Sequence, residues 1–201
     1  MAVGVDPNST DKQEYTPISW AAEYGHEALV KLFLAKKVVN PDHNDVNGRT
    51  PLSNSAKNGH EGVVRLLIAS KGVDSDSADN LGWIPLALAA QLRHKGVVKL
   101  LLASGRVNPD SKNYLGRNPL SLAAENGHEE VVRLLLATGQ FDPDPRDSDR
   151  RTPLSRVVHN GFEAVVKLFL AQEQVNKSPV DNYGITPLLL ATQTRHEAIL
   201  K

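Results

Sequence analysis

The chain has 201 residues, with 23 Lys and Arg against 23 Asp and Glu, no Cys, and only 5% aromatic residues. Its formal charge of zero disfavours DNA or RNA as a partner, because nucleic-acid binders attract phosphate through a basic surface, and the lack of Cys excludes disulfides, thiolate nucleophiles and cysteine-bound zinc. No run approaches the roughly 18 apolar residues that a membrane span needs, so we expect no membrane association and an intracellular, cytoplasmic location.

A single template recurs along the chain with a period of 34 residues. Its proline stands at Pro17, Pro51, Pro85, Pro119, Pro153 and Pro187. Six residues earlier an Asp or Asn keeps the same step, at Asp11, Asp45, Asp79, Asn113, Asp147 and Asp181. We therefore predict one continuous domain of repeats with the bounds 11–44, 45–78, 79–112, 113–146, 147–180 and a partial 181–201, after a tail of a preceding repeat at 1–10.

Each repeat is expected to hold a pair of short helices. Thr, Asn or Ile precedes the proline, which is typical of an N-cap followed by Pro at the first helical position. The first helix continues through small residues and ends near a glycine such as Gly59, and an apolar run such as 63–68 forms the second helix. The predicted pairs span 17–36, 51–70, 85–104, 119–138 and 153–172, with a partial last pair.

Between the helix pairs lie stretches rich in Asn, Asp, Pro, Ser and Gly, such as 105–117, which predict a projecting turn or hairpin. Tetratricopeptide repeats also have a 34-residue period, but their short turns leave no room for these stretches. The segments 48–52, 116–124 and 126–136 resemble ankyrin repeats. This resemblance implies an all-α solenoid of helix-turn-helix pairs with projecting β-turn fingers, whose fingers and first helices form a concave groove that binds partners.

The chain departs from the usual ankyrin pattern in two ways. The repeat is one residue longer than the usual 33, and the His that normally follows Pro-Leu is replaced. The replacements are Ser19, Ser53, Ala87, Ser121, Ser155 and Leu189. We expect the hydrogen bonds of that His to be weakened or replaced, and the pattern is similar to fungal-type ankyrin arrays.

Both ends of the chain fall inside a repeat. Residues 5–11 align with 39–45, and 197–201 supply only the start of a second helix. We interpret the chain as a segment of a longer array, with a short protein with frayed ends as the alternative. Because uncapped repeats expose an apolar flank, end-to-end self-association through the terminal repeats is a further expectation.

No pattern of residues predicts catalysis, a cofactor or a metal site. Five His residues share one repeat position, at His26, His60, His94, His128 and His196. Equivalent positions in stacked repeats lie about 10 Å apart and cannot share a metal, so we expect packing and hydrogen bonding at the turn between helices. The acidic cluster Asp142, Asp144, Asp147 and Asp149 lacks the central Gly and closing Glu of a calcium loop.

The turn between the two helices holds Gly in most repeats but Arg93 and Arg195 in two. If this position requires a positive φ, a non-Gly residue there costs about 1 kcal/mol. Arg93 also begins a local basic spot with His94 and Lys95, which we interpret as tolerated variation rather than a contact for an acidic partner.

The candidate partner-binding residues lie in the fingers and beside the first helices, where the sequence varies on a fixed frame. Aromatic and arginine side chains are typical of interaction hot spots. The candidates are Tyr15, Arg49, Leu81, Trp83, Leu92, Tyr114, Leu115, Arg117, Arg151 and Tyr183. Trp20 is equally compatible with packing and with contact. We predict a non-catalytic module that binds a protein partner, with a structural spacer of a larger signalling or sensor protein as the alternative.

Overall fold

A computed structural model of the chain describes residues 6–200, so the expectations for residues 1–5 fall outside the described part. Six pairs of short helices follow one another in that part, and it contains no strand. The first helices of the pairs are α1 (Pro17–Glu23), α3 (Pro51–Lys57), α5 (Pro85–Gln91), α7 (Pro119–Glu125), α9 (Pro153–Asn160) and α11 (Pro187–Gln193). The second helices are α2 (Glu27–Leu34), α4 (Glu61–Ile68), α6 (Lys95–Ala103), α8 (Glu129–Ala137), α10 (Glu163–Leu170) and α12 (Glu197–Leu200).

The predicted all-α architecture of repeated helix pairs is confirmed, and the five complete pairs end one or two residues before the predicted bounds. Each first helix begins at a fixed signal, a proline at its first position. Thr16 precedes Pro17, and its Oγ1 accepts a hydrogen bond from the Ser19 backbone N–H at 3.2 Å. Ile84 has no side chain that can cap α5, and Asn118 caps α7 in place of Thr.

Serine at the usual His position takes part in the N-terminal cap of its own helix. The hydroxyl of Ser19 lies 2.8 Å from Thr16 Oγ1, and Ser121 Oγ donates to Asn118 Oδ1 at 2.9 Å. At these positions the serine hydroxyl therefore bonds within the start of its own helix.

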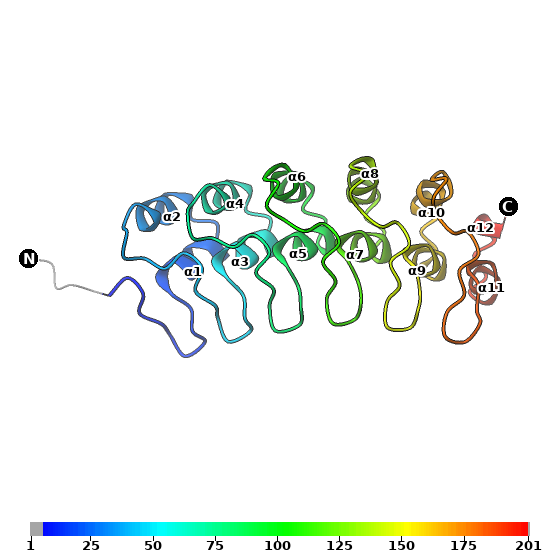
Figure 1. Cartoon of the computed structure of the whole chain (residues 1–201), viewed down its shortest axis with the longest axis horizontal. Helices are drawn as coiled ribbons and strands as arrows, with labels where there is room; N and C mark the ends of the chain where they lie inside the picture. Colours follow the sequence, from blue (N-terminus) through cyan, green and yellow to red (C-terminus); the bar gives the residue numbers. More distant parts are fainter. Residues whose placement is uncertain (1–5, 201) are drawn as a thin grey trace, which may run out of the picture. The chain divides into compact units, whose positions relative to one another are not determined.

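The described residues fall into two compact units that meet between Asn108 and Pro109. In unit 1, α1 packs on α3 and α3 on α5, while α2 packs on α4 and α4 on α6. In unit 2, α7, α9 and α11 pack in the same way, as do α8, α10 and α12. Figure 1 shows that within each unit the loops project beside the first helices, away from the second helices.

Within each unit, the core lies between the two helices of one repeat and those of its neighbour. The leucine that directly follows each regularly spaced proline is almost fully buried at Leu52, Leu86, Leu120 and Leu154. The paired valines of the second helices are also buried, for example Val63–Val64 and Val131–Val132. Burial of such side chains stabilises the fold by roughly 1.5–3 kcal/mol each. Because this core fixes the frame, the finger residues are free to differ from repeat to repeat.

The turn between the helices has a left-handed residue in every repeat. Its φ is positive at Gly25, Gly59, Gly127 and Gly161, and also at Arg93 (+65°) and Arg195 (+58°). The predicted backbone strain at the two arginines is therefore present. At Gly59 a side chain would also collide with a neighbour, because a Cβ there would lie 2.5 Å from Nδ1 of His94.

Candidate functional site

One carboxylate or amide holds each finger in a closed turn. In the third repeat, Asp79 Oδ1 accepts hydrogen bonds from the backbone N–H groups of Leu81 and Trp83, both at 2.9 Å, and its own N–H donates to the Trp83 carbonyl at 3.0 Å. The same pattern recurs at Asp11, Asp45, Asn113, Asp147 and Asp181. The residues of the tip are thus held in place before any partner arrives.

Neighbouring fingers are also joined by their backbones within each unit. The Asn80 N–H donates to the Asn47 carbonyl at 2.8 Å in unit 1, and the Ser148 N–H donates to the Leu115 carbonyl at 3.0 Å in unit 2. These bonds add to the rigidity of the tips. A partner that binds them therefore costs the protein little conformational entropy.

The predicted apolar candidates at the finger tips reach solvent. Tyr114 is 77% exposed and Tyr183 76%, and Leu81 and Leu115 are also exposed. Leu92, which follows α5, is exposed too, whereas Tyr15 and Trp83 are half-buried. Leu81, Trp83 and Leu92 lie in unit 1, and Tyr114 and Leu115 lie in unit 2.

The three predicted arginines have internal partners. The Arg49 guanidinium donates from Nε to Oδ2 of Asp79 at 3.2 Å, and Arg151 makes the equivalent bond to Asp181 at 3.1 Å. In both cases one Asp oxygen holds its own finger and the other binds the arginine of the preceding repeat. Arg117 binds Glu125 instead, with Nη1 2.8 Å from Oε2. These arginines therefore hold the fingers in position.

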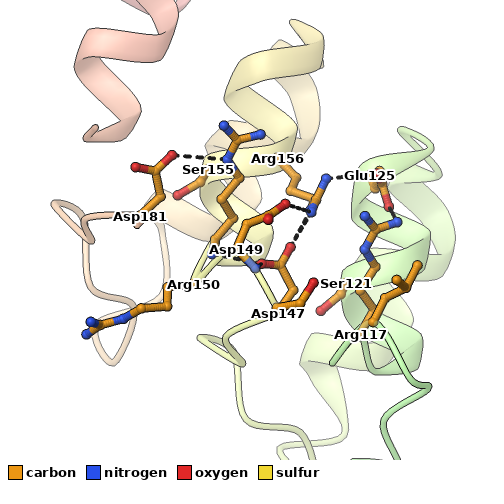
Figure 2. Close-up of polar contacts among 12 residues, drawn as sticks. Arg117, Ser121, Glu125, Asp147, Asp149, Arg150, Ser155, Arg156 and Asp181 are labelled. Carbon is orange, nitrogen blue, oxygen red and sulfur yellow. Dashed lines mark hydrogen bonds and ion pairs between the residues drawn. The ribbon is translucent and has the colours of Figure 1, made fainter. Parts of the chain in front are cut away.

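Unit 2 also contains an ion-pair network centred on Arg156 of α9, which the sequence analysis did not single out. The Arg156 side chain is only 13% exposed. Its Nε donates to Asp147 at 2.6 Å, its Nη1 lies 3.3 Å from Oε1 of Glu125, and its Nη2 lies 3.4 Å from Asp149. Figure 2 shows Arg156 between Glu125 on one side and the two aspartates on the other.

A polar cavity of about 220 Å³ lies beside this network, lined by Glu125, Arg151, Arg156, His159 and Asn160. Its two guanidinium groups are both engaged by carboxylates. The network therefore offers no uncompensated charge to a ligand. We interpret it as a structural clamp between neighbouring repeats.

The corresponding face of the first repeat is aromatic. The rings of Tyr15 and Trp20 have centroids 4.6 Å apart and are tilted by 35°, and Trp20 stacks on Tyr24 at 5.6 Å with 7° between the planes. The Trp20 indole N–H donates to Oδ2 of Asp11 at 3.0 Å, and Tyr24 is 61% exposed. We call the side chains of Tyr15, Trp20 and Tyr24 the aromatic ladder.

The surroundings of Tyr15 disfavour the ionised form of its phenol. Burial, followed by the nearby carboxylates of Glu23 and Asp45, raises the pKa of Tyr15 to about 12, although the Arg49 guanidinium acts in the opposite direction. The sequence predicts Tyr15 as a contact residue and is equally compatible with a packing role and a contact role for Trp20. The spacing 15, 20 and 24 joins a finger to one face of α1 and its C-cap, and this spacing is the signal that could have brought the three rings together.

His60, His94 and His196, which share one repeat position, each bond a backbone carbonyl. His60 Nε2 bonds the Glu23 carbonyl at 2.9 Å, and His94 Nε2 bonds the Lys57 carbonyl at 2.9 Å. Each ring thus links the start of a second helix to the end of the first helix of the repeat before it. His196 bonds the His159 carbonyl at 3.1 Å in the same way.

The loops after the second helices carry partly buried carboxylates. Burial raises the pKa of Asp42, of Asp76 and of Asp144, although each accepts a backbone hydrogen bond from the next repeat, which acts in the opposite direction. Among residues 6–200 no group of three or more His, Asp or Glu side chains is arranged to hold a metal ion. Over the same residues no helix is long and apolar enough to cross a bilayer.

A family model of ankyrin repeats, three copies long, matches residues 1–79 and 69–147. The chain belongs to the ankyrin-repeat family. Ankyrin repeats are generally protein–protein interaction modules and typically have no enzymatic activity. No curated protein matches the chain at a significant level.

Proposed function

We propose that this ankyrin-repeat chain is a non-catalytic module that binds a protein partner on the groove surface formed by its fingers and first helices. The observation that carries the proposal is the placement of the aromatic residues. All 4 Tyr and both Trp lie in a finger, on α1 or directly after it. These residue types are enriched at binding hot spots and depleted on ordinary surfaces.

The contact residues of this proposal are those predicted from the sequence together with the aromatic ladder. In unit 1, Leu81, Trp83 and Leu92 offer apolar area, and in unit 2 Tyr114, Leu115 and Tyr183 do so at the finger tips. Arg49, Arg117 and Arg151 are retained as contact residues with a changed role. Because they already bind Asp79, Glu125 and Asp181, a partner carboxylate would have to share them with these internal partners.

The experiment is quantitative affinity capture from cell extract with three forms of the chain. We expect the double variant Trp83→Ala, Tyr114→Ala to lose the bound proteins that the wild type enriches, because each truncation removes about 2 kcal/mol or more at a hot spot. Lys99→Ala, an exposed change on α6, is the control and should retain them. Loss with Lys99→Ala and retention with the double variant would overturn the groove assignment.

The alternative is a spacer that only positions other parts of a larger protein. It predicts that wild type and the double variant enrich the same proteins. The cytoplasmic location and the likeness to fungal arrays stay predictions from the sequence.

End-to-end self-association also stays a prediction. Its candidate surface in unit 2 includes the exposed Leu188 and Leu189 and an apolar recess of about 120 Å³ beside Leu154 and Ile199. Light scattering of wild type and Leu188→Lys would test it. A mass that stays monomeric at high concentration would contradict the prediction.

A further inference from the structure

The internal symmetry of the chain places two glutamates in equivalent positions with different surroundings. Glu23 ends α1 and Glu125 ends α7, three repeats later. Two guanidinium groups bind Glu125, from Arg117 at 2.8 Å and from Arg156 at 3.3 Å. The residues that occupy these two positions beside Glu23 are Tyr15 and Asn54. The carboxylate of the first repeat therefore lacks both cations that its counterpart binds.

The structure leaves hydrogen-bond acceptors unused at this position. Within residues 6–200, no donor reaches the buried Oε2 of Glu23 or the buried Oδ1 of Asn54. Asn54 is only 1% exposed, and its amide nitrogen lies 3.4 Å from the Tyr15 hydroxyl. Buried acceptors without partners are rare in proteins, because such a group loses its bonds to water and gains none in return. Both groups lie near Tyr15, since the Asn54 amide reaches its hydroxyl and the Glu23 carboxylate acts on its phenol.

The chemistry of these atoms selects the ligand. A guanidinium carries five N–H donors and no acceptor, and it is the group that binds Glu125 in unit 2. Its planar, delocalised cation also stacks on aromatic rings, which an ammonium does less well. The Tyr15 surroundings contain the cation of Arg49, but that guanidinium is bound to Asp79 at 3.2 Å.

The aromatic ladder supplies such rings beside Glu23. Trp20 and Tyr24 are stacked with nearly parallel planes, and both are exposed. The indole is fixed by its bond to Asp11, so little side-chain freedom is lost when a ligand stacks on it. Attraction between a cation and a Trp or Tyr face adds to that of the carboxylate.

We propose that Glu23, Asn54 and the aromatic ladder form a binding site for an arginine side chain of the protein partner. This proposal rests on the proposed function and names the chemistry of the partner at one position. The guanidinium would pack against the exposed part of the stacked Trp20–Tyr24 pair and donate hydrogen bonds to the Glu23 carboxylate. It would bring to Glu23 the positive charge that Arg117 and Arg156 bring to Glu125.

The direct test uses N-acetyl-arginine N-methylamide and its uncharged analogue N-acetyl-citrulline N-methylamide, titrated into the whole chain and followed by NMR. We expect the arginine compound to shift the Trp20 indole N–H signal in a saturable way and to bind about tenfold more tightly than the citrulline compound. Glu23→Gln and Trp20→Ala should each remove most of the binding. Glu61→Gln, the same charge change on an exposed position of α4, is the matched control and should retain it. Equal binding of the two compounds, or equal effects of Glu23→Gln and Glu61→Gln, would overturn the site.

A second experiment separates this inference from the proposed function. Peptides selected from a random displayed library on the wild-type chain are tested against Glu23→Gln and Trp83→Ala. Peptides that share an arginine and lose binding to Glu23→Gln support the site. A second outcome is that the peptides share no arginine, bind Glu23→Gln as well as the wild type, and lose binding to Trp83→Ala. This outcome overturns the arginine site but supports the proposed function. Peptides that bind all variants equally contradict both.

Discussion

The surfaces beside the fingers of units 1 and 2 share one helical frame but differ in how their carboxylates are paired. In unit 2, Arg117 and Arg156 bind Glu125, and Arg156 also binds Asp147, so charges of the face are satisfied within the protein. In unit 1 the equivalents are Tyr15 and Asn54, and within residues 6–200 no donor reaches the buried Oε2 of Glu23. The same two repeat positions can therefore hold arginines that join neighbouring repeats, as in unit 2, or leave a carboxylate oxygen unpartnered, as in unit 1.

The largest effect should come from breaking the unit 2 network. Arg156→Ala leaves Glu125 and the largely buried Asp147 without their shared cation, and we expect the free energy of unfolding to fall by about 3 kcal/mol. Asn54→Ala, at the equivalent position in unit 1, should cost much less because Asn54 makes only one long side-chain bond, at 3.4 Å. Urea denaturation measures both. Equal losses would show that the network adds nothing beyond packing.

A smaller effect should come from the turn between the two helices of a repeat, which holds Gly in most repeats but Arg in others. Arg93→Gly should raise the free energy of unfolding by about 1 kcal/mol, because Arg93 has a φ of +65° that only glycine adopts without strain. Gly59→Ala tests the same turn in the opposite direction and should destabilise unit 1, since its Cβ would meet the ring of His94. Thermal melts of both variants check this. An Arg93→Gly variant no more stable than the wild type would contradict the strain.

The Tyr15 phenol reports on the uncompensated charge in unit 1. Burial and the carboxylates of Glu23 and Asp45 raise the pKa of Tyr15 to about 12. Because a negative neighbour disfavours phenolate, Glu23→Gln should lower this pKa and Glu61→Gln should leave it unchanged. NMR-detected alkaline titration of the Tyr15 ring measures the value. An identical titration in Glu23→Gln would mean that Glu23 does not act on the ladder.

The smallest effect is expected in the loops outside both faces. Asn8 shows what an amide does there: its oxygen accepts from the Asn40 N–H at 2.8 Å and its nitrogen donates to the Val38 carbonyl at 2.7 Å. Asp76, at the equivalent position two repeats later, accepts from the Asn108 N–H at 2.7 Å but leaves Oδ1 buried without a partner. Asp76→Asn should therefore stabilise the chain slightly at neutral pH.

The pH dependence of that variant has a definite sign. Burial raises the pKa of Asp76 in the folded state above its ordinary 3.8, so the ionised carboxylate destabilises the folded state at neutral pH. As the pH falls through the raised pKa towards 3.8, protonation relieves the wild type and the advantage of Asp76→Asn shrinks. Urea denaturation at neutral and acidic pH measures the difference. An advantage that grows on acidification would contradict the role of charge.

The fold was predictable from sequence because its signals repeat at fixed steps. A capping residue before Pro17 or Pro51, a glycine at the turn and an apolar run after it each encode one local event, and six copies make the period unmistakable. The positive φ at Arg93 followed from the same alignment. Helix α2 ends two residues before its predicted bound: the Ala35 N–H still donates to the Lys31 carbonyl, but the Lys36 N–H donates to Phe33, only three residues back. No residue type in 35–36 specifies this tighter turn.

The candidate site was only partly predictable, since its partners come from different repeats. Arg49 and Asp79 are 30 residues apart, and the same step joins Arg151 to Asp181. The period could have revealed these pairs, but the arginines were interpreted as free contact residues. The ion pairs of Arg156 and the unpartnered oxygen of Glu23 depend on which side chains face each other across neighbouring first helices. The sequence does not specify these facing pairs.

The most direct test of the comparison is one substitution made at both equivalent positions. Glu125→Gln removes the carboxylate that two guanidinium groups bind, so we expect the free energy of unfolding to fall by about 2 kcal/mol. Glu23→Gln removes a carboxylate with a buried, unpartnered oxygen, so stability should stay equal or rise. Urea denaturation of the two variants beside the wild type gives the answer. Equal losses at Glu23 and Glu125 would contradict the account.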